Sequence, residues 1–239
     1  MNAIMITLPE REGVADASVR RLLEAGVETK VFTQPSSWPV GPESNQRNAI
    51  RALMESSGDV LFVEDDITVK SGRLQRALRE AKEITYFYVH DTLDMVGRYP
   101  DGEFSRKAKV MLGEGKKDKS VFLDFNRTVV PEYVWDVGSE SLFGSQAVFI
   151  PEARVKQIID FSFNNLNFEP KFPPRKSVSF DVLLNRFRKS FGVPGLVYMP
   201  HPVQHLESRV GRTPRARHAY SISFGLQSDL EVGHASSHD

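Results

Sequence analysis

The stretch GDVLFVEDDI, residues 58–67, carries the strongest signals for both the fold and the function of this chain. Its apolar and β-branched residues form a run without a polar face, as expected of a strand that is covered on both sides. Three consecutive carboxylates, Glu64, Asp65 and Asp66, follow directly. Adjacent like charges raise one another's pKa unless a cation lies among them. The stretch therefore predicts either a solvated acidic turn or a site that binds a metal ion.

Strand and helix signals alternate on both sides of this stretch. Apolar strand-like segments occur at 2–8, 27–33, 60–67 and 84–89. Amphipathic helix-like segments occur between them, at 15–26, 44–58 and 71–83. This rhythm predicts an α/β fold with a doubly wound, mostly parallel sheet flanked by helices. In such sheets ligands bind beyond the carboxyl ends of the strands, where the three acids are expected to lie.

The second half of the chain is less regular. It contains strand signals at 145–151 and 195–199 and helix signals at 151–161 and 179–192. Capping preferences suggest Asp16 and Ser179 as N-caps of their helices. At 3.6 residues per turn, the apolar residues of the first two helices are expected to face the core: Val19, Leu22, Leu23, Ile50, Leu53 and Met54.

The composition is that of a globular protein. The 239 residues are 40% hydrophobic and 26% charged, and the 16 phenylalanines imply a substantial core. The formal net charge is zero, so no global field favours nucleic acid or an anionic membrane. The chain has no cysteine, which excludes disulfides and thiolate sites and fits a cytoplasmic location. No run approaches the roughly 20 apolar residues of a membrane span.

Five segments, taken in order, resemble a GT-A fold glycosyltransferase. In that family an Arg/Asn-bearing helix ending in Gly-Asp precedes an apolar strand and a DxD-type acidic motif. A glycine-containing acceptor-side loop, an acidic residue opening a helix and a late histidine follow. The matching segments are TLPERE (7–12), SNQRNAIRALMESSGDVLFVEDD (44–66), SLFGSQAVFIP (141–151), VSFDVLLNRF (178–187) and PHPVQHLES (200–208).

The resemblance implies a single GT-A-like domain over residues 1–225. The end of the sequence has no periodicity, so we expect residues 226–239 to form a disordered tail. Residues 1–97 would bind the nucleotide sugar, and residues 98–225 would form the acceptor side. The implied activity is metal-dependent transfer of a sugar from a nucleotide-diphosphate sugar, with UDP favoured as nucleotide, to an acceptor hydroxyl. The acceptor could belong to a polysaccharide, a protein or a hydroxymethylated DNA base, and segments 98–119 and 162–177 are the candidates to meet it.

The acidic motif is Glu-Asp-Asp rather than Asp-X-Asp, so the resemblance alone does not assign the metal ligands. We expect Asp66 to bind Mn²⁺ or Mg²⁺ directly, with Glu64 on the same face by strand alternation. Asp65 would then point elsewhere or reach the donor sugar. The resemblance implies that His205 completes the metal shell, and His201 is a nearby competitor.

The resemblance also implies a nucleotide pocket next to the acids. Thr7, Pro9 and Arg11 follow the first strand, and Arg11 would pair with the diphosphate. Arg47 and Asn48 would contact the base or ribose from the next helix. The simpler interpretation is that Arg11 is a surface residue on a loop and that Arg47 and Asn48 solvate the first turn of a helix.

Asp181 is the candidate catalytic base, because a carboxylate can remove the proton of the acceptor hydroxyl in an inverting transfer. Its charge would also suit the N-terminus of its helix without any catalytic role. Trp135 would either stack on an acceptor or belong to the core. Four arginines between Arg209 and Arg217 form either a solvated tail, a flap over the diphosphate or a contact to DNA.

Two other classes of function compete with sugar transfer. A metal-dependent nucleotidyltransferase would share the sheet and the paired carboxylates, but it usually has a glycine-rich phosphate loop after the first strand, and TLPEREG has no glycine cluster. A non-catalytic protein that binds nucleotide sugars or nucleic acid would keep the basic segment without needing Asp181.

Overall fold

The computed structural model describes residues 2–89, 98, 102, 105–106, 129–142, 144–165, 179–206, 224 and 227–231. Within these residues, seven strands form one mixed sheet in the order β2-β1-β3-β8-β5-β9-β7. Its strands are β1 (Asn2–Thr7), β2 (Glu28–Thr33), β3 (Val60–Glu64), β5 (Thr85–Tyr86), β7 (Tyr133–Asp136), β8 (Ala147–Ile150) and β9 (Leu196–Met199).

Most strands of the sheet point the same way. β2, β1 and β3 are parallel to one another, and β5 is parallel to β9. The two reversed strands are β8, which lies between β3 and β5, and β7, which closes the edge beside β9. The predicted α/β class with a mostly parallel sheet is thereby confirmed, with β8 and β7 as the antiparallel members.

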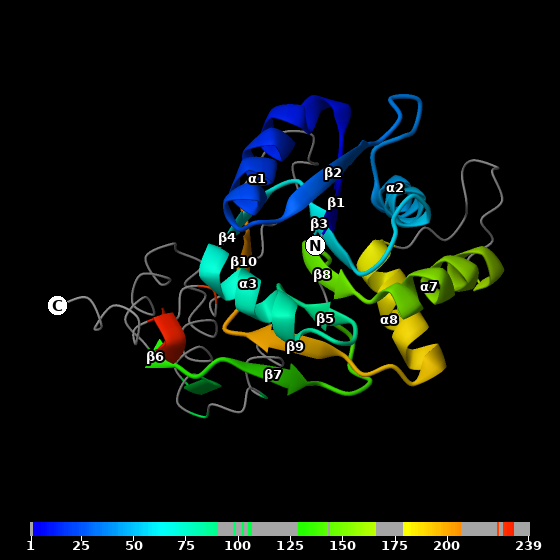
Figure 1. The fold of residues 1–239 in the computed structure, drawn as a ribbon. Coiled ribbons are helices and arrows are strands. Elements are labelled where there is room, and N and C mark those ends of the chain that lie inside the picture. Colours follow the sequence, from blue (N-terminus) through cyan, green and yellow to red (C-terminus); the bar gives the residue numbers. More distant parts are fainter. Residues whose placement is uncertain are drawn as a thin grey trace.

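Among the described residues, helices cover both faces of this sheet (Figure 1). One face carries α1 (Glu12–Glu24) and α3 (Ser71–Glu80), which pack over the side chains of Ala3, Met5 and Leu61. The other face carries α2 (Pro42–Met54), α7 (Glu152–Asn165) and α8 (Phe180–Phe191). Two separate hydrophobic clusters result, one on each side of the sheet. This explains why β3 has no polar face before Glu64.

The helix faces agree with the predicted pattern except at two positions. Leu22, Ile50 and Leu53 are buried as expected. Leu23 and Met54 are 61% and 58% exposed, so their predicted place in the core is wrong. Successive helix residues are turned by about 100°, so burial of Leu22 carries Leu23 out of the narrow contact with the sheet.

Of the two predicted N-caps, one lies at the start of its helix and the other does not. α1 begins at Glu12, after the short 3₁₀ helix η1 (Pro9–Arg11), so Asp16 lies inside the helix and is not its N-cap. Ser179 occupies the N-cap position of α8, although its hydroxyl makes no capping bond to the backbone. Instead the hydroxyl donates to the carboxylate of Asp181.

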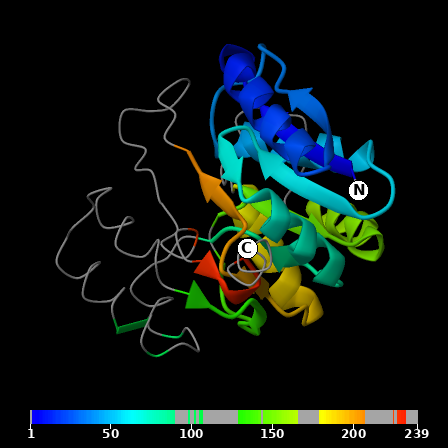
Figure 2. The same cartoon turned by 60° about the vertical axis from the view of Figure 1, so that its left-hand side comes forward.

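Among the described residues, two pairs of short strands lie outside the main sheet, one antiparallel and one parallel. β4 (Ile67–Val69) pairs antiparallel with β10 (Val203–His205) directly after the acidic residues. β6 (Val129–Val130) pairs in parallel with β11 (Gln227–Ser228), and Figure 2 shows the red β11 beside the green β6. Residues 227–231 are therefore structured, unlike the disordered tail that we expected from residue 226 onward.

Several predicted features lie wholly or mostly outside the described residues, including the basic segment 209–217 and most of 98–119 and 162–177. Trp135 lies on the edge strand β7 and packs, partly buried, against the core.

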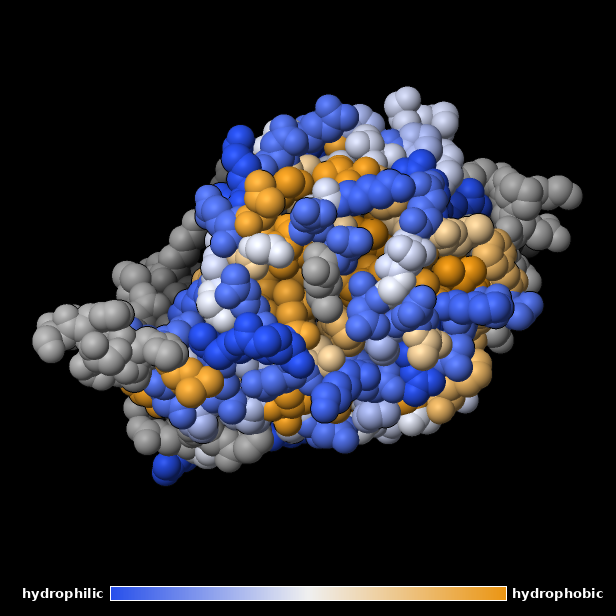
Figure 3. Space-filling view, viewed as in Figure 1, coloured by the Kyte–Doolittle hydropathy of each residue, from blue (hydrophilic) through white to orange (hydrophobic). Residues whose placement is uncertain are grey.

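In the view of Figure 1, hydrophobic surface gathers in the middle of the molecule between hydrophilic rims (Figure 3). Among the described helices, none combines the length and the apolar character that a membrane span requires.

Candidate active site

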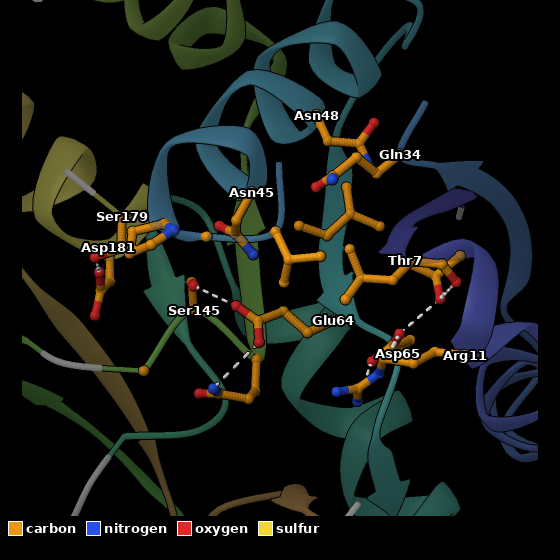
Figure 4. Close-up of a pocket in the computed structure, with 17 residues that line it drawn as sticks. Thr7, Arg11, Gln34, Asn45, Asn48, Glu64, Asp65, Ser145, Ser179 and Asp181 are labelled. Atoms are coloured by element: carbon orange, nitrogen blue, oxygen red, sulfur yellow. Dashed lines mark hydrogen bonds and ion pairs between the residues drawn. The ribbon is translucent and has the colours of Figure 1, made fainter. Parts of the chain in front are cut away.

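A cavity of about 350 Å³ lies where β1 and β3 end, and it collects side chains from six parts of the chain (Figure 4). Six residues that the sequence suggested for the site are in its lining: Thr7, Arg11, Asn48, Glu64, Asp65 and Asp181. The polar or charged residues of the whole lining are Thr7, Arg11, Gln34, Asn45, Asn48, Glu64, Asp65, Ser145, Gln146, Ser179 and Asp181.

The sheet topology brings these residues together. β1 and β3 are parallel neighbours in the register Ile6↔Glu64, so both deliver their following residues to one edge. β8 is antiparallel to β3, with Ala147 opposite Val63, so the residues that precede β8 arrive at the same edge. The N-terminal ends of α2 and α8 also line the cavity. Helix N-termini present unpaired N–H groups and positive partial charge, which favour anions.

Glu64, the last residue of β3, lies in the middle of the cavity in Figure 4, with Ser179 and Asp181 on one side and Thr7, Arg11 and Asp65 on the other. Its carboxylate accepts hydrogen bonds from Ser145 Oγ at 2.8 Å and Gln146 Nε2 at 3.3 Å. Burial raises the pKa of Glu64 and the nearby Asp66 carboxylate raises it further, while His205 and the hydrogen bond from Ser145 partly oppose this. Glu64 is thus a hydrogen-bonding carboxyl group that faces the ligand space.

Asp65 is buried and held by Thr7, the last residue of β1, and by Arg11 of η1. Arg11 Nε donates to Asp65 Oδ2 at 2.9 Å and Arg11 Nη2 donates to Asp65 Oδ1 at 2.6 Å, so the pair is bidentate. Thr7 Oγ1 donates to Asp65 Oδ2 at 2.6 Å. This arrangement gives Asp65, for which the sequence analysis left two options, a defined place beside Thr7 and Arg11 at the cavity wall.

Asp66 is not among the residues that line the cavity and is completely buried. Arg11 Nη2 lies 2.7 Å from Asp66 Oδ2, and His205 Nε2 lies 3.0 Å from Asp66 Oδ1. The expectation that Glu64 and Asp66 share one face of a strand is wrong, because β3 ends at Glu64 and the chain bends before β4. The β4–β10 pairing, with Ile67 opposite His205, then brings the imidazole to Asp66.

The three predicted metal ligands do not form a ligand set in this arrangement. Glu64 faces the cavity, whereas Asp66 is directed at Arg11 and His205. Across the described residues, no group of three His, Cys, Asp or Glu side chains is placed to hold a metal ion. Carboxylate oxygens already contacted by a guanidinium do not fit the requirement of Mg²⁺ or Mn²⁺ for converging oxygen ligands. Binding of either ion stays a prediction that conflicts with this geometry.

Asp181, the predicted base, lies in the first turn of α8 at the cavity wall. Its Oδ1 accepts a hydrogen bond from the backbone N–H of Val182 at 2.8 Å and another from Ser179 Oγ. The carboxylate is therefore oriented by its own helix terminus, as the simpler interpretation of Asp181 requires. It also borders the ligand space, as a catalytic role requires.

The other predicted nucleotide contacts divide into two groups. Asn48 lines the cavity, but its amide also donates to the Phe32 carbonyl at 2.7 Å and accepts from Arg51 at 2.7 Å. Pro9 and Arg47 are not among the lining residues. Pro9 is exposed and opens η1, which positions Arg11. Arg47 forms an ion pair with Glu43 one turn earlier on α2, at 3.1 Å.

His201, the competitor of His205, is completely buried and faces Arg73, whose guanidinium donates to the His201 carbonyl. Burial and the charge of Arg73 lower the pKa of His201 to about 3. His201 is therefore neutral and does not line the cavity. His205 is the histidine that contacts the acidic residues.

Several lining residues were not identified from the sequence, namely Gln34, Asn45, Ser145, Gln146 and Ser179 in any binding role. Asn45 lies one turn before Asn48 on the same helix face, so its position was available from the helix period. Ser145 and Gln146 reach the site only because β8 runs antiparallel to β3. No local pattern signals the direction of a strand in its sheet.

No protein-family model and no curated protein sequence matches the chain. Solved structures with low similarity include the apo-form glycosyltransferase GlyE from Streptococcus pneumoniae TIGR4, at 8% identity and a TM-score of 0.40. That match covers 81% of this chain and 44% of GlyE, so this chain spans less than half the length of that protein.

Two further solved structures with low similarity are a nucleotidyl-transferring enzyme and a second glycosyltransferase. The inositol-1-phosphate CTP transferase from T. maritima is 11% identical, with a TM-score of 0.35 and coverage of 82% of this chain and 65% of that one. A glycosyltransferase involved in glycosylation of the major capsid of PBCV-1 is 12% identical, with a TM-score of 0.29 and coverage of 82% and 92%. With TM-scores below 0.5, these likenesses carry no functional argument, and the site itself has to supply one.

Proposed function

We propose that the protein is a glycosyltransferase that moves a sugar from a nucleotide-diphosphate sugar, with UDP as the favoured nucleotide, to an acceptor hydroxyl. One observation carries this proposal. A single cavity at the carboxyl ends of two parallel strands is lined both by Asp181 and by Thr7, Arg11, Asn48, Glu64 and Asp65. Cavities at this edge of an α/β sheet are the usual place for a bound nucleotide.

The chemistry of the lining suits both halves of such a donor. The N-terminal ends of α2 and α8 face the cavity and favour the oxygens of a diphosphate. The carboxyl group of Glu64 and the amide of Asn45 offer acceptors for sugar or ribose hydroxyls. Asp181 would accept the proton of the acceptor hydroxyl while that oxygen attacks the anomeric carbon and the nucleoside diphosphate leaves.

Donor binding is the first test. The protein is incubated with a panel of UDP-, GDP-, ADP- and CMP-sugars, in separate arms with Mn²⁺ and with EDTA, and the Tm and slow donor hydrolysis are measured. We expect one nucleotide class to raise the Tm, since a ligand at one hundred times its Kd stabilises a protein by about 2.7 kcal/mol. Failure of every donor in both arms would overturn the proposal.

Replacement of Asp181 by asparagine tests the role of the base. Asp181→Asn keeps the shape of the side chain and removes its basicity, so we expect donor binding to persist while transfer falls on the order of 100-fold or more. The control is Asp160→Asn, which removes an exposed carboxylate on α7 that pairs with Lys156 away from the cavity. Equal transfer by both variants would contradict a catalytic role for Asp181.

The same assay separates the two rival functions and the acceptor classes. Release of pyrophosphate from a nucleoside triphosphate would indicate a nucleotidyltransferase, and donor binding that no acceptor converts would indicate a binding protein. Oligosaccharides, peptides and hydroxymethylated DNA are the acceptors to screen, because these are the classes that the sequence resemblance implies. DNA binding through residues 209–217 would appear as a salt-dependent loss of affinity.

A further inference from the structure

The buried acids Asp65 and Asp66 raise a question of charge balance. Their exposed fractions are 5% and 0%, and Glu64 lies directly before them. Removing a carboxylate from water without a compensating cation is costly, and two adjacent ones repel each other as well. A stable fold therefore needs a cation at this point of the chain.

Arg11 supplies positive charge to both acids at once. One guanidinium reaches Asp65 through Nε and Nη2, at 2.9 and 2.6 Å, and reaches Asp66 through Nη2 at 2.7 Å. The arginine is itself only 5% exposed. Burial lowers the pKa of Arg11, but the Asp65 and Asp66 carboxylates outweigh that effect and raise it. The guanidinium is therefore a fixed positive charge rather than a mobile surface group.

Hydrogen bonds from neighbouring segments position this ion cluster. The 3₁₀ helix η1 fixes Arg11, and its backbone N–H donates to the Leu8 carbonyl at 2.9 Å. Ser18 of α1 donates to the Asp65 carbonyl at 2.7 Å. On the far side, the Leu206 N–H donates to the Asp66 carbonyl at 2.7 Å, beside His205. The backbone of the acidic turn is thus tied to α1 and to the residue that follows β10, while Arg11 holds the two carboxylates.

We propose that Arg11 is the resident cation of the Asp65–Asp66 cluster and takes the place that a divalent metal ion was expected to hold, so that the protein binds its donor without Mn²⁺ or Mg²⁺. The planar guanidinium matches two carboxylates with directed hydrogen bonds. A metal ion would have to displace those bonds and draw both carboxylates to about 2.1 Å from one point. The inference concerns the site of the proposed function, and only its donor arm rests on that function.

The first test uses the unmodified protein. Mn²⁺ is titrated into metal-free wild-type protein, and bound ion is measured by the loss of the free Mn²⁺ signal in electron paramagnetic resonance. We expect no saturable binding at one ion per chain and no change in Tm between Mn²⁺ and EDTA. Stoichiometric Mn²⁺ binding by the wild-type protein would overturn the proposal, whatever the variants do.

The second test removes the resident cation. In Arg11→Met the acidic cluster loses its positive charge, so we expect the Tm to fall by several degrees in EDTA and Mn²⁺ to restore part of that loss. The matched control is Arg21→Met, because Arg21 donates to the Ile67 carbonyl at 3.2 Å beside the same turn without an ion pair to the acids. Mn²⁺ should leave the Tm of this control unchanged. A Tm of Arg11→Met that equals that of Arg21→Met in both arms would contradict the role of Arg11.

The third test measures donor binding, and it separates failure of this inference from failure of the proposed function. If a nucleotide sugar raises the Tm, we expect the same rise in EDTA and in Mn²⁺. Donor binding that EDTA abolishes would overturn the inference and leave sugar transfer standing. If no donor binds in either arm the proposed function fails, and the Mn²⁺ titrations of wild-type protein and Arg11→Met still decide the role of Arg11.

Discussion

Two asparagines on one face of α2 differ in their hydrogen bonds. Asn48 donates to the Phe32 carbonyl at the end of β2 and accepts from Arg51. Asn45, one turn earlier, has a buried Oδ1 with no hydrogen-bond partner among the described residues, and it lines the cavity. A buried acceptor without a partner is costly, and a ligand donor at this position would satisfy it.

The two asparagines therefore make a matched pair of variants. We expect Asn48→Ala to lower the free energy of unfolding by about 1–3 kcal/mol, because it leaves the buried Phe32 carbonyl without its donor. Asn45→Ala should change stability by less than about 0.5 kcal/mol and weaken donor binding instead. Urea unfolding and the donor-induced rise in Tm measure the two effects. The reverse result, with Asn45→Ala the less stable variant, would show that Asn45 is structural.

At the scale of elements, buried arginines fasten the segments that surround the sheet. Arg188 of α8 is 1% exposed, and its Nη2 donates to the Gly138 carbonyl at 2.8 Å. Gly195, just before β9, lies directly against this guanidinium. A Cβ at Gly195 would lie 2.0 Å from Arg188 Nη2 and 2.9 Å from Val137 Cγ2. The junction between α8 and β9 thus depends on a residue without a side chain.

This close approach predicts a strong effect of one methyl group. Gly195→Ala forces a tethered, buried arginine to move, and we expect a loss of about 1–3 kcal/mol in the free energy of unfolding. The control is Gly13→Ala in α1, where a Cβ meets nothing within 4 Å and alanine favours the helix by up to about 1 kcal/mol. Urea unfolding of both variants checks the prediction, which fails if the two lose stability equally.

Across the whole molecule, Glu132 links distant parts of the chain. Arg76 of α3 donates to both of its carboxylate oxygens, at 2.9 and 2.6 Å, and the hydroxyl of Tyr198 in β9 donates at 2.6 Å. Nearby, Glu231 accepts from Arg73 at 2.6 Å and so ties the residues after β11 to α3. The described C-terminal residues therefore belong to the folded unit.

These contacts predict how the fold responds to acid. Burial raises the pKa of Glu132, but hydrogen bonds from Arg76, Ser228 and Tyr198 outweigh it and lower the pKa to about 2. A carboxylate with a lowered folded-state pKa adds stability above its unfolded pKa of about 4.3, and that stability is lost as the pH falls toward 2.

The comparison of wild-type protein with Glu132→Gln isolates this contribution. Between about pH 5 and pH 2, wild-type protein should lose on the order of 1–2 kcal/mol more unfolding free energy than the variant. Urea unfolding at a series of pH values measures the difference. Identical pH profiles would show that the Glu132 cluster does not contribute to acid stability.

The local elements of this fold were predictable because their signals are local. The apolar run before Glu64, the helix periods of α2 and α8 and the position of Ser179 at the start of α8 all follow from neighbouring residues. The same holds for the placement of the acids at a strand's carboxyl end. The edge strand β7, the β4–β10 pair and the reversed direction of β8 have no such local signature, because strand pairing depends on segments far apart in sequence.

The acidic triplet separates what neighbouring residues imply from what the packing of remote elements decides. From the sequence, Glu64, Asp65 and Asp66 required a nearby cation, since clustered carboxylates repel one another. Which cation lies nearest was decided by tertiary structure alone, because η1 brings Arg11 within about 3 Å of the carboxylates of Asp65 and Asp66. The β4–β10 register likewise brings the imidazole of His205 to 3.0 Å from Asp66 Oδ1. Charge compensation acts over such short distances that only the packing of remote elements can settle it.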